Sequence, residues 1–367
     1  MIRVAFPFVG DTIGGSHVSS LLLMQHLATE GFDPTAIVHT EGALAPWLDR
    51  HATKVLRIDL PFVSAQERGL SAVPSLIWGA VKLARFLCKN NFSIVHANDG
   101  RMIASWMPAA RLAKVVGIAH RRTVWGHSRL ALLALRSATR VVAISNYVKN
   151  SLPDIVKRRS TVVLNPIGTK GPAREQGQML VRQLVGRDGP VVAFVGTLQE
   201  QKQPGVFIEA AALIHQQRPD VHFLMVGRES AMGAQLLDQV RKLGLSTNLS
   251  LTGFRADAWS LIAGSDMLMA PAINEGHGRT LIEAMLCGVP IVAAASGGHS
   301  EVVANGKTGL LVEPGSPQAF AQAVLRLLEN RGERERLSNA GLSWAREFAS
   351  PAAHAAAIAG IYRQCLR

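Results

Sequence analysis

The chain has 367 residues, 48% of them hydrophobic and 18% charged, a composition that argues against intrinsic disorder and suits two domains. No run of about 18 uncharged apolar residues occurs, so we expect no membrane-spanning helix. The three cysteines, Cys88, Cys287 and Cys365, are widely spaced, which argues against a disulfide framework or a zinc site and favours a reducing cytoplasm.

Positive charge is concentrated in the first half of the chain. The formal net charge is +13, and residues 1–170 hold 21 Lys and Arg against nine Asp and Glu, a net +12. Such a field implies an anionic partner, either acidic lipid headgroups, a phosphorylated acceptor or nucleic acid, with simple solubility as the alternative. The basic residues form no recognisable nucleic-acid module and few aromatic residues accompany them, so we expect no nucleic acid.

Short apolar runs alternate with helical stretches through the first half. The runs predict strands at residues 2–8, 34–39, 55–60, 93–98, 115–120, 140–145 and 161–164. Strands this apolar, separated by crossover segments, indicate a mainly parallel sheet covered on both faces. The first of them reads as a buried strand and not as a signal peptide, because its apolar stretch is too short and no cleavage site follows.

The second half repeats this arrangement, with strands predicted at residues 191–195, 221–226, 249–253, 267–272, 291–295 and 309–312. We place the boundary where Pro and Gly interrupt the pattern, giving an N-terminal domain of residues 1–168 and a second domain of residues 169–350. The fold class is therefore α/β, with two Rossmann-like, doubly wound domains in tandem. Because ligands bind beyond the carboxyl ends of parallel strands, we expect the site in a cleft between the two domains.

A glycine pair follows the first strand. Gly14 and Gly15 precede a helix expected at residues 18–30, where backbone can approach a ligand and helix N–H groups can meet a phosphate. A tight turn explains the pair equally well. The absence of a Gly-x-Gly-x-x-Gly run argues against a nicotinamide dehydrogenase.

Two further segments of the first half carry candidate groups. Residues 75–89 form an amphipathic stretch with Lys82, Arg85 and Lys89, which suits either docking on an anionic membrane or an ordinary core-facing helix. His120 ends a predicted strand with Arg121 and Arg122 beside it. That position favours a ligand-facing histidine and two cations that neutralise an acceptor phosphate; a packed histidine and solvated arginines are the alternative.

The most informative segment is residues 274–285. It joins the strand at 267–272 to a helix that closes on Gly288 and Pro290, so Gly276 and Gly278 lie at a helix N-terminus, a favourable place for a phosphate. Glu275 and Glu283 bracket this position. A carboxylate beside a phosphate is unfavourable unless it binds something else, and sugar or ribose hydroxyls are the obvious candidates.

Glu275 and Glu283, with seven residues between them, are followed by Ala284-Met285, by Gly288-Val289-Pro290 and by Gly297-Gly298. This run, from Asp266 to Val312, resembles the signature of retaining glycosyltransferases of family 4, which have the GT-B fold. The resemblance implies that the C-terminal helix, residues 351–367, packs back on the first domain. It also implies that Gly14 and Gly15 lie over the donor diphosphate, and that His120 contacts the donor sugar.

Within the second domain, the resemblance implies a complete donor site. Glu275 would bind sugar hydroxyls, backbone N–H groups near Gly278 to Leu281 the diphosphate, and Glu283 ribose hydroxyls. Lys202 matches a diphosphate-binding lysine, but Thr197 stands where the family has an arginine, so a hydroxyl replaces a bidentate cation unless Arg279 or Arg255 substitutes. His277 replaces the usual aromatic. The remaining expected nucleotide-sugar contacts are Gly253, Phe254, Arg255, Arg279 and Thr280.

The resemblance implies transfer of a sugar from a UDP- or GDP-sugar to a glycan or lipid-linked acceptor in the synthesis of a bacterial surface polysaccharide or lipopolysaccharide. It also implies that the sugar's configuration is retained and that no metal or other cofactor is needed. Glu275 and His120 are the candidate catalytic residues, although Glu275 and Glu283 are not the acid and base of a glycosidase. We expect a cytoplasmic protein, with peripheral attachment to the inner face of the plasma membrane as an option. A sugar-nucleotide-binding subunit without activity and a GT-B nucleotide-sugar epimerase are the alternatives.

Overall fold

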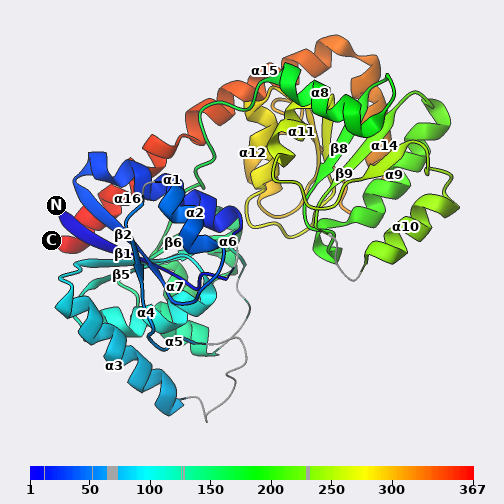
Figure 1. The fold of residues 1–367 in the computed structure, drawn as a ribbon. Coiled ribbons are helices and arrows are strands. Elements are labelled where there is room, and N and C mark those ends of the chain that lie inside the picture. Colours follow the sequence, from blue (N-terminus) through cyan, green and yellow to red (C-terminus); the bar gives the residue numbers. More distant parts are fainter. Residues whose placement is uncertain (12, 52, 64–72, 125, 127–128, 229–231) are drawn as a thin grey trace. The chain divides into compact units, whose positions relative to one another are not determined.

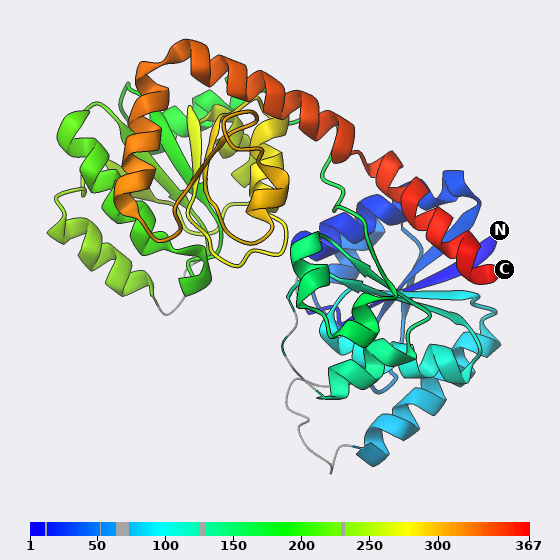
Figure 2. The same ribbon diagram turned by 180° about the vertical axis from the view of Figure 1, so that it is seen from behind.

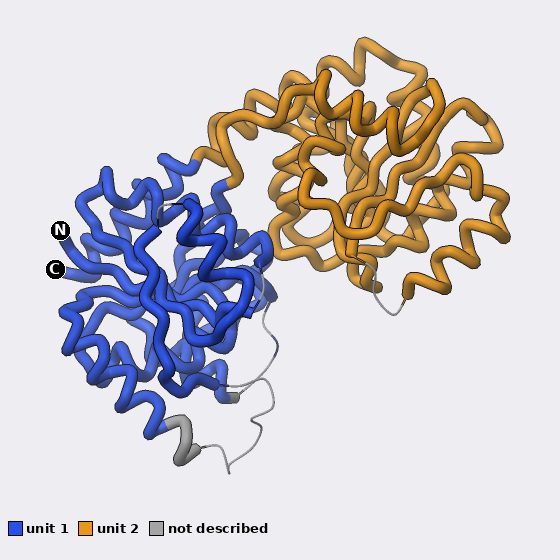
Figure 3. The backbone as a smooth tube through the Cα atoms, viewed as in Figure 1, with its two compact units in different colours: residues 1–166, 351–367 blue, residues 167–350 orange. Residues whose placement is uncertain are grey.

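The computed structural model describes residues 1–367 apart from 12, 52, 64–72, 125, 127–128 and 229–231. The chain forms two compact units, one of Met1–Pro166 with Pro351–Arg367 and one of Ile167–Ser350 (Figure 3). The boundary between the two units therefore follows Pro166, two residues before the expected boundary at 168. Residue 12 of the glycine loop lies outside the described residues. So do the side chains at the start of the expected amphipathic stretch.

Unit 1 is built on a seven-stranded parallel sheet in the order β3-β2-β1-β4-β5-β6-β7 (Figure 1). Its strands are β1 (Ile2–Phe8), β2 (Phe32–Val38), β3 (Val55–Arg57), β4 (Ile94–Ala97), β5 (Val116–Arg121), β6 (Arg140–Ala143) and β7 (Ser160–Val162). Its helices are α1 (Gly15–Leu27), η1 (Ala28–Glu30), α2 (Leu44–Arg50), α3 (Val73–Lys89), α4 (Gly100–Leu112), α5 (Arg129–Ser137), α6 (Asn146–Ser151), α7 (Asp154–Lys157) and α16 (Pro351–Leu366).

The alternation of side chains along each strand divides the core of unit 1 between the two faces of the sheet. On β1, Val4 and Phe6 pack with residues of α1, α2 and α16, while Ala5 belongs to the core under α3, α4 and α5. The C-terminal helix α16 packs against α1, and the buried Tyr362 ring meets Phe32 edge-on at 5.1 Å between centroids. Residues from both ends of the chain therefore share one core.

Unit 2 is built on a six-stranded parallel sheet in the order β10-β9-β8-β11-β12-β13. Its strands are β8 (Val191–Val195), β9 (His222–Val226), β10 (Leu249–Leu251), β11 (Met267–Ala270), β12 (Ile291–Ala294) and β13 (Leu310–Val312). Its helices are α8 (Arg174–Val185), η3 (Glu200–Lys202), α9 (Pro204–Gln217), α10 (Gly233–Lys242), α11 (Ala258–Gly264), α12 (Arg279–Leu286), α13 (His299–Val302), α14 (Pro317–Glu329) and α15 (Arg331–Phe348). Figure 2 shows α15 and α16 from behind, as successive helices at the end of the chain.

The prediction of two parallel, doubly wound sheets is confirmed, with each expected apolar run forming a strand. Bounds differ by a few residues where pairing decides them. β2 begins at Phe32 and not at 34, because Phe32 is buried and pairs with Ile2 at the start of β1. Pro34 is tolerated there since β3 joins β2 only from Ala36 onward. Among the described residues, no helix is long and apolar enough to cross a membrane.

Candidate functional site

The strand order of unit 2 reverses between β8 and β11, which makes the carboxyl ends of these two strands the topological switch point. The loop after β8 carries Thr197 and Lys202, and the loop after β11 carries Glu275. Backbone hydrogen bonds join the loops, since Ile273 N donates to Gln201 O at 2.9 Å and the Gln201 side chain donates to Asn274 O at 3.0 Å. The sheet topology thus brings together two segments more than 70 residues apart.

Lys202 and Glu275 form an ion pair across these loops, with Lys202 Nζ donating to Glu275 Oε1. Both side chains are largely buried, so their attraction is stronger than that of an exposed pair. The pair places a cation and a carboxylate at the switch point, where a phosphate and a hydroxyl-bearing group could bind side by side. Both were predicted from the sequence as donor contacts, and the structure brings them together.

Glycines let the loop after β12 press against the loop that holds Glu275. Gly298 N donates to Glu275 O at 2.7 Å, and a Cβ on Gly298 would lie 2.6 Å from Gly276 O. At Gly297, where φ is +57°, a Cβ would lie 2.6 Å from Glu275 O. Because backbone atoms cannot move aside as side-chain ends do, the Gly-Gly pair is required for this close approach.

Helix α12 begins at the same place. Gly278 precedes it with φ +87°, and a Cβ there would lie 2.8 Å from His299 Cδ2. No side chain in the described part of the chain caps this helix, so the positive end of its dipole favours an anion here. Leu281 N donates to Gly278 O at 3.1 Å and its side chain is fully buried, while Thr280 lies half-buried in the first turn.

Glu283 lies one turn into α12 and is paired with Arg279, whose Nε is 2.7 Å from Glu283 Oε1. Burial raises the pKa of the Glu283 carboxyl, while Arg279 opposes the shift. Arg279 is therefore engaged by a carboxylate. It does not lie free to replace the arginine that Thr197 lacks.

His299, the first residue of α13, was missed by the sequence analysis although it directly follows the Gly297-Gly298 pair. It is buried, its Nδ1 has no hydrogen-bond partner among the described residues, and burial lowers its pKa to about 4. Glu275 opposes this shift of the pKa and Lys202 adds to it. His277, in the position of the usual aromatic, is also buried.

The ends of β9 and β10 adjoin the exposed Thr197. Gly253 has φ +69°, Phe254 is 66% exposed, and Arg255 forms a two-bond ion pair with Asp257 at 2.7 and 2.8 Å. Arg255 is therefore also engaged. Arg228, after β9, was not predicted; its guanidinium lies over the Phe254 ring at 5.3 Å from the centroid.

In unit 1, the strand order reverses between β1 and β4, and Gly14 and Gly15 lie beyond the end of β1. Both glycines are exposed at the start of α1. Gly14 N donates to His17 Nδ1 at 3.1 Å, so this N–H is already bonded. Burial lowers the pKa of His17, with Asp11 opposing the shift and Arg122 adding to it.

The structure does not support a ligand-facing His120. Its ring is fully buried: Nδ1 lies 3.0 Å from His96 Nε2, and the ring stacks on His354 of α16 at 5.9 Å between centroids. His96 in turn lies 2.6 Å from the Tyr362 hydroxyl. Burial, then Arg122, lowers the pKa of His120 well below its usual value, so the ring is neutral. The packed alternative describes this residue, because α16 covers the end of β5.

The two arginines after His120 have different surroundings. Arg121 is buried and donates to the carbonyls of Thr123 and Val124 at 3.3 and 3.1 Å, which makes it part of its own loop and not the exposed cation that was expected. Arg122 is half-buried and donates to the side-chain oxygens of Asn98 and Asn165. These two contacts orient its guanidinium, and its expected role beside the acceptor stays a prediction.

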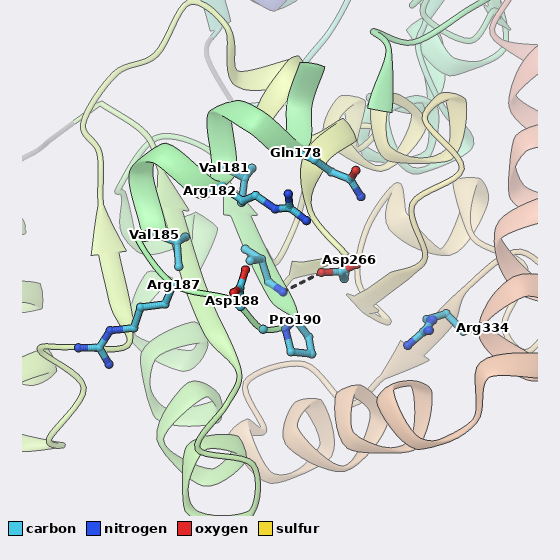
Figure 4. Close-up of a pocket in the computed structure, with 12 residues that line it drawn as sticks. Gln178, Val181, Arg182, Val185, Arg187, Asp188, Pro190, Asp266 and Arg334 are labelled. Atoms are coloured by element: carbon cyan, nitrogen blue, oxygen red, sulfur yellow. Dashed lines mark hydrogen bonds between the residues drawn. The ribbon is translucent and has the colours of Figure 1, made fainter. Parts of the chain in front are cut away.

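A separate cavity of about 310 Å³ lies at the opposite edge of the unit 2 sheet (Figure 4). Its lining includes Asp266, which accepts a hydrogen bond from Val191 N at 2.9 Å and pairs with Arg174 at 3.2 Å. These contacts tie the start of β11 to the start of β8. Asp266 therefore has a structural role at the amino ends of these strands.

Known families match both units. Residues 181–344 match the family described as glycosyl transferases group 1, and residues 13–170 match glycosyltransferase family 4. The chain belongs to the family 4 glycosyltransferases. It is thus a transferase of the glycosyl-transferring class, and its two parallel-sheet domains are those of the GT-B fold.

Individual relatives agree. The glycosyltransferase is 26% identical to the UDP-Gal:alpha-D-GlcNAc-diphosphoundecaprenol alpha-1,3-galactosyltransferase of Escherichia coli, over 90% of this chain and 89% of that protein. The structure of HepE of Anabaena with UDP-glucose covers 99% of this chain and 100% of its own, with a TM-score of 0.83 at 21% identity. WaaG, a glycosyltransferase involved in lipopolysaccharide biosynthesis, has a TM-score of 0.70 at 17% identity over 98% and 99% of the two chains.

Proposed function

We propose that this enzyme is a retaining glycosyltransferase that moves a sugar from a UDP-sugar to a lipid-linked or glycan acceptor of a bacterial surface polysaccharide. The observation that carries the proposal is the Lys202–Glu275 pair beside the uncapped start of α12. The names of two relatives favour UDP over GDP, since the galactosyltransferase uses UDP-Gal and HepE was solved with UDP-glucose.

Each donor group has a counterpart in unit 2. Lys202 and the start of α12 bind the diphosphate, because the ammonium group and the positive end of the helix dipole both favour an anion. When the donor binds, the hydrogen bond from Lys202 to Glu275 breaks, and the Glu275 carboxylate accepts hydrogen bonds from hydroxyl groups of the sugar instead. Glu283 is held by Arg279 and accepts hydrogen bonds from the ribose.

In the proposed reaction, the bond between the sugar anomeric carbon and the diphosphate oxygen breaks, and the acceptor oxygen attacks from the same face. The departing phosphate takes the acceptor proton, so neither Glu275 nor Glu283 acts as a nucleophile. Lys202 and the helix N–H groups stabilise the charge that develops on the leaving diphosphate. We propose that this charge is balanced without a divalent metal. Addition of EDTA would then leave turnover unchanged.

Unit 1 is proposed to bind the acceptor and a membrane surface. Helix α3 packs Leu83 and Leu87 into the core, as in the core-facing alternative, but Ile77 and Trp78 are 61% and 56% exposed. Lys82 Nζ lies 3.5 Å from the Trp78 ring centroid. A tryptophan and a cation in contact on one helix suit the headgroup region of an anionic bilayer.

Transfer from radiolabelled UDP-galactose and UDP-glucose to undecaprenyl-diphosphate sugars tests the reaction, and NMR of the product tests retention. An α-linked product from an α-linked donor is expected. A β-linked product would refute retention, whereas release of an epimerised sugar without an acceptor would instead indicate an epimerase.

Flotation with vesicles containing anionic lipid tests the membrane surface. Trp78→Ser is expected to reduce binding at physiological salt, while Trp47→Ser, on α2, is expected to leave it unchanged. Equal binding of both variants and the unaltered enzyme would exclude α3 as the contact.

A further inference from the structure

Among the described residues, four Lys and Arg side chains follow strands at the carboxyl edge of the unit 2 sheet, and their partners differ. Lys202 is paired with Glu275, Arg255 with Asp257 and Arg279 with Glu283. Arg228 has no carboxylate partner in the described part of the chain, and it is exposed. A phosphate could bind Arg228 without breaking an ion pair.

Backbone contacts place Arg228 beside the loop that bears Thr197. Leu198 N donates to Arg228 O at 3.2 Å, and Gly196 N donates to Val226 O at 3.0 Å. A Cβ on Gly227 would lie only 1.8 Å from Gly196 O, so the loops after β8 and β9 are in direct backbone contact. Arg228 therefore lies next to the loop of Thr197, the residue that stands where the family has an arginine.

Lys202 also lies close to Gly196. Its Cδ lies 3.5 Å from the position that a Cβ would occupy on Gly196. Lys202 and Arg228 are thus both attached close to the contact between Gly196 and Gly227. Two cations near one glycine contact suit a diphosphate, which carries charge on both phosphoryl groups.

The Phe254 ring supports the arginine in the unbound enzyme. A cation over an exposed aromatic ring is held weakly, so the guanidinium can move to a phosphate at little cost. Its planar fork can then donate two parallel hydrogen bonds, which a threonine hydroxyl cannot.

We infer that Arg228 binds the diphosphate of the sugar-nucleotide donor and supplies the charge that Thr197 does not. This inference rests on the proposed function of unit 2. It assigns to the loop after β9 a role that the Glu-x7-Glu motif does not cover. In this chain the diphosphate-binding arginine comes from a neighbouring strand.

Calorimetric titration of UDP and of uridine into the full-length enzyme tests the inference. Arg228→Met keeps an apolar stem against Phe254 and removes the charge. It is expected to weaken UDP binding by about 10- to 100-fold and to leave uridine binding unchanged. Arg187→Met removes an exposed arginine from the opposite edge of the same sheet and is expected to change neither.

The decisive variant places the arginine at position 197 in place of position 228. Thr197→Arg combined with Arg228→Met is expected to recover most of the lost UDP affinity, which a misfolded loop could not do. Equal UDP affinity of Arg228→Met and the unaltered enzyme would overturn the inference alone. So would an equal loss for UDP and uridine, which would place Arg228 at the base. An unaltered enzyme that binds no nucleotide would overturn the proposed function as well.

Discussion

Lys202 donates a hydrogen bond to the Glu275 carboxylate from a loop 73 residues earlier in the chain. In the unbound enzyme each side chain thus satisfies the charge of the other. A donor would replace this bond with two others, phosphate to Lys202 and sugar hydroxyls to Glu275. The ion pair therefore holds both side chains in the positions from which they would contact the donor.

Removal of the Lys202 charge is expected to weaken nucleotide binding. Lys202→Met should lower UDP affinity by about 10- to 100-fold, the value of one charge-assisted hydrogen bond to a phosphate. Lys307→Met, which removes an exposed lysine after α13, is the control and should bind UDP normally. Calorimetry measures both; an unaffected Lys202 variant would exclude this lysine from the diphosphate site.

Glu275→Gln should separate sugar recognition from nucleotide binding. The variant keeps the shape of the side chain but releases Lys202 from its carboxylate, so UDP should bind at least as well as before. Affinity for the UDP-sugar and the rate of transfer should fall, because an amide is a weaker acceptor for sugar hydroxyls. A parallel loss of UDP and UDP-sugar affinity would show that Glu275 does not contact the sugar.

Glu283 is predicted to recognise the ribose, and the ligand can be varied along with the protein. Glu283→Gln should weaken UDP binding several-fold while hardly affecting a UDP analogue that lacks the ribose hydroxyls. The reason is that the analogue has no ribose hydroxyls, so it makes no hydrogen bond to the Glu283 carboxylate that the substitution could remove. Equal effects on both ligands would assign Glu283 to supporting Arg279 alone.

His299 should make the stability of the enzyme depend on pH. Burial lowers its pKa to about 4 from 6.5, so the folded state binds a proton less readily than the unfolded state. Its contribution is complete above pH 6.5 and is lost as the pH falls to about 4, at a cost of up to about 3 kcal/mol. Urea unfolding should therefore show a smaller loss on acidification for His299→Gln than for the unaltered enzyme.

The exposed His51 supplies the control for that comparison. His51→Gln should lose as much stability as the unaltered enzyme when the pH falls. Part of that loss comes from the buried His96 and His120 of unit 1, whose pKa values are lowered. An identical pH dependence for His299→Gln would refute the burial of a neutral His299.

Gly298→Ala should destabilise the enzyme and weaken UDP-sugar binding. The new Cβ would lie 2.6 Å from Gly276 O and 2.7 Å from His277 Cα, so the loop that holds Glu275 must move. Forcing a carbon into such a contact costs about 1 to 3 kcal/mol. Gly332→Ala, with its nearest atom at 3.7 Å in the exposed start of α15, should be neutral or slightly stabilising in thermal unfolding.

Much of the site could be predicted because its residues follow strands in a fixed order. Lys202, Glu275 and Glu283 are local features of strand-loop-helix segments, and each lies where the sequence places it. His299 and Arg228 were not found, although both directly follow a glycine at a strand end. Their importance depends on which strands are neighbours in the sheet, and β8 meets β11 only after the reversal of strand order.

The sequence by itself determined the α/β architecture, the parallel strands and the family, because alternating apolar runs and one long motif are properties of the chain's order. The tertiary structure alone decided which charges are engaged. Arg255 and Arg279 are paired with carboxylates, Arg228 lies next to the Thr197 loop with no carboxylate partner among the described residues, and His120 is buried and stacks on His354 of α16. Ion pairing and burial depend on distances between segments far apart in sequence, and these distances exist only once the sheet has formed.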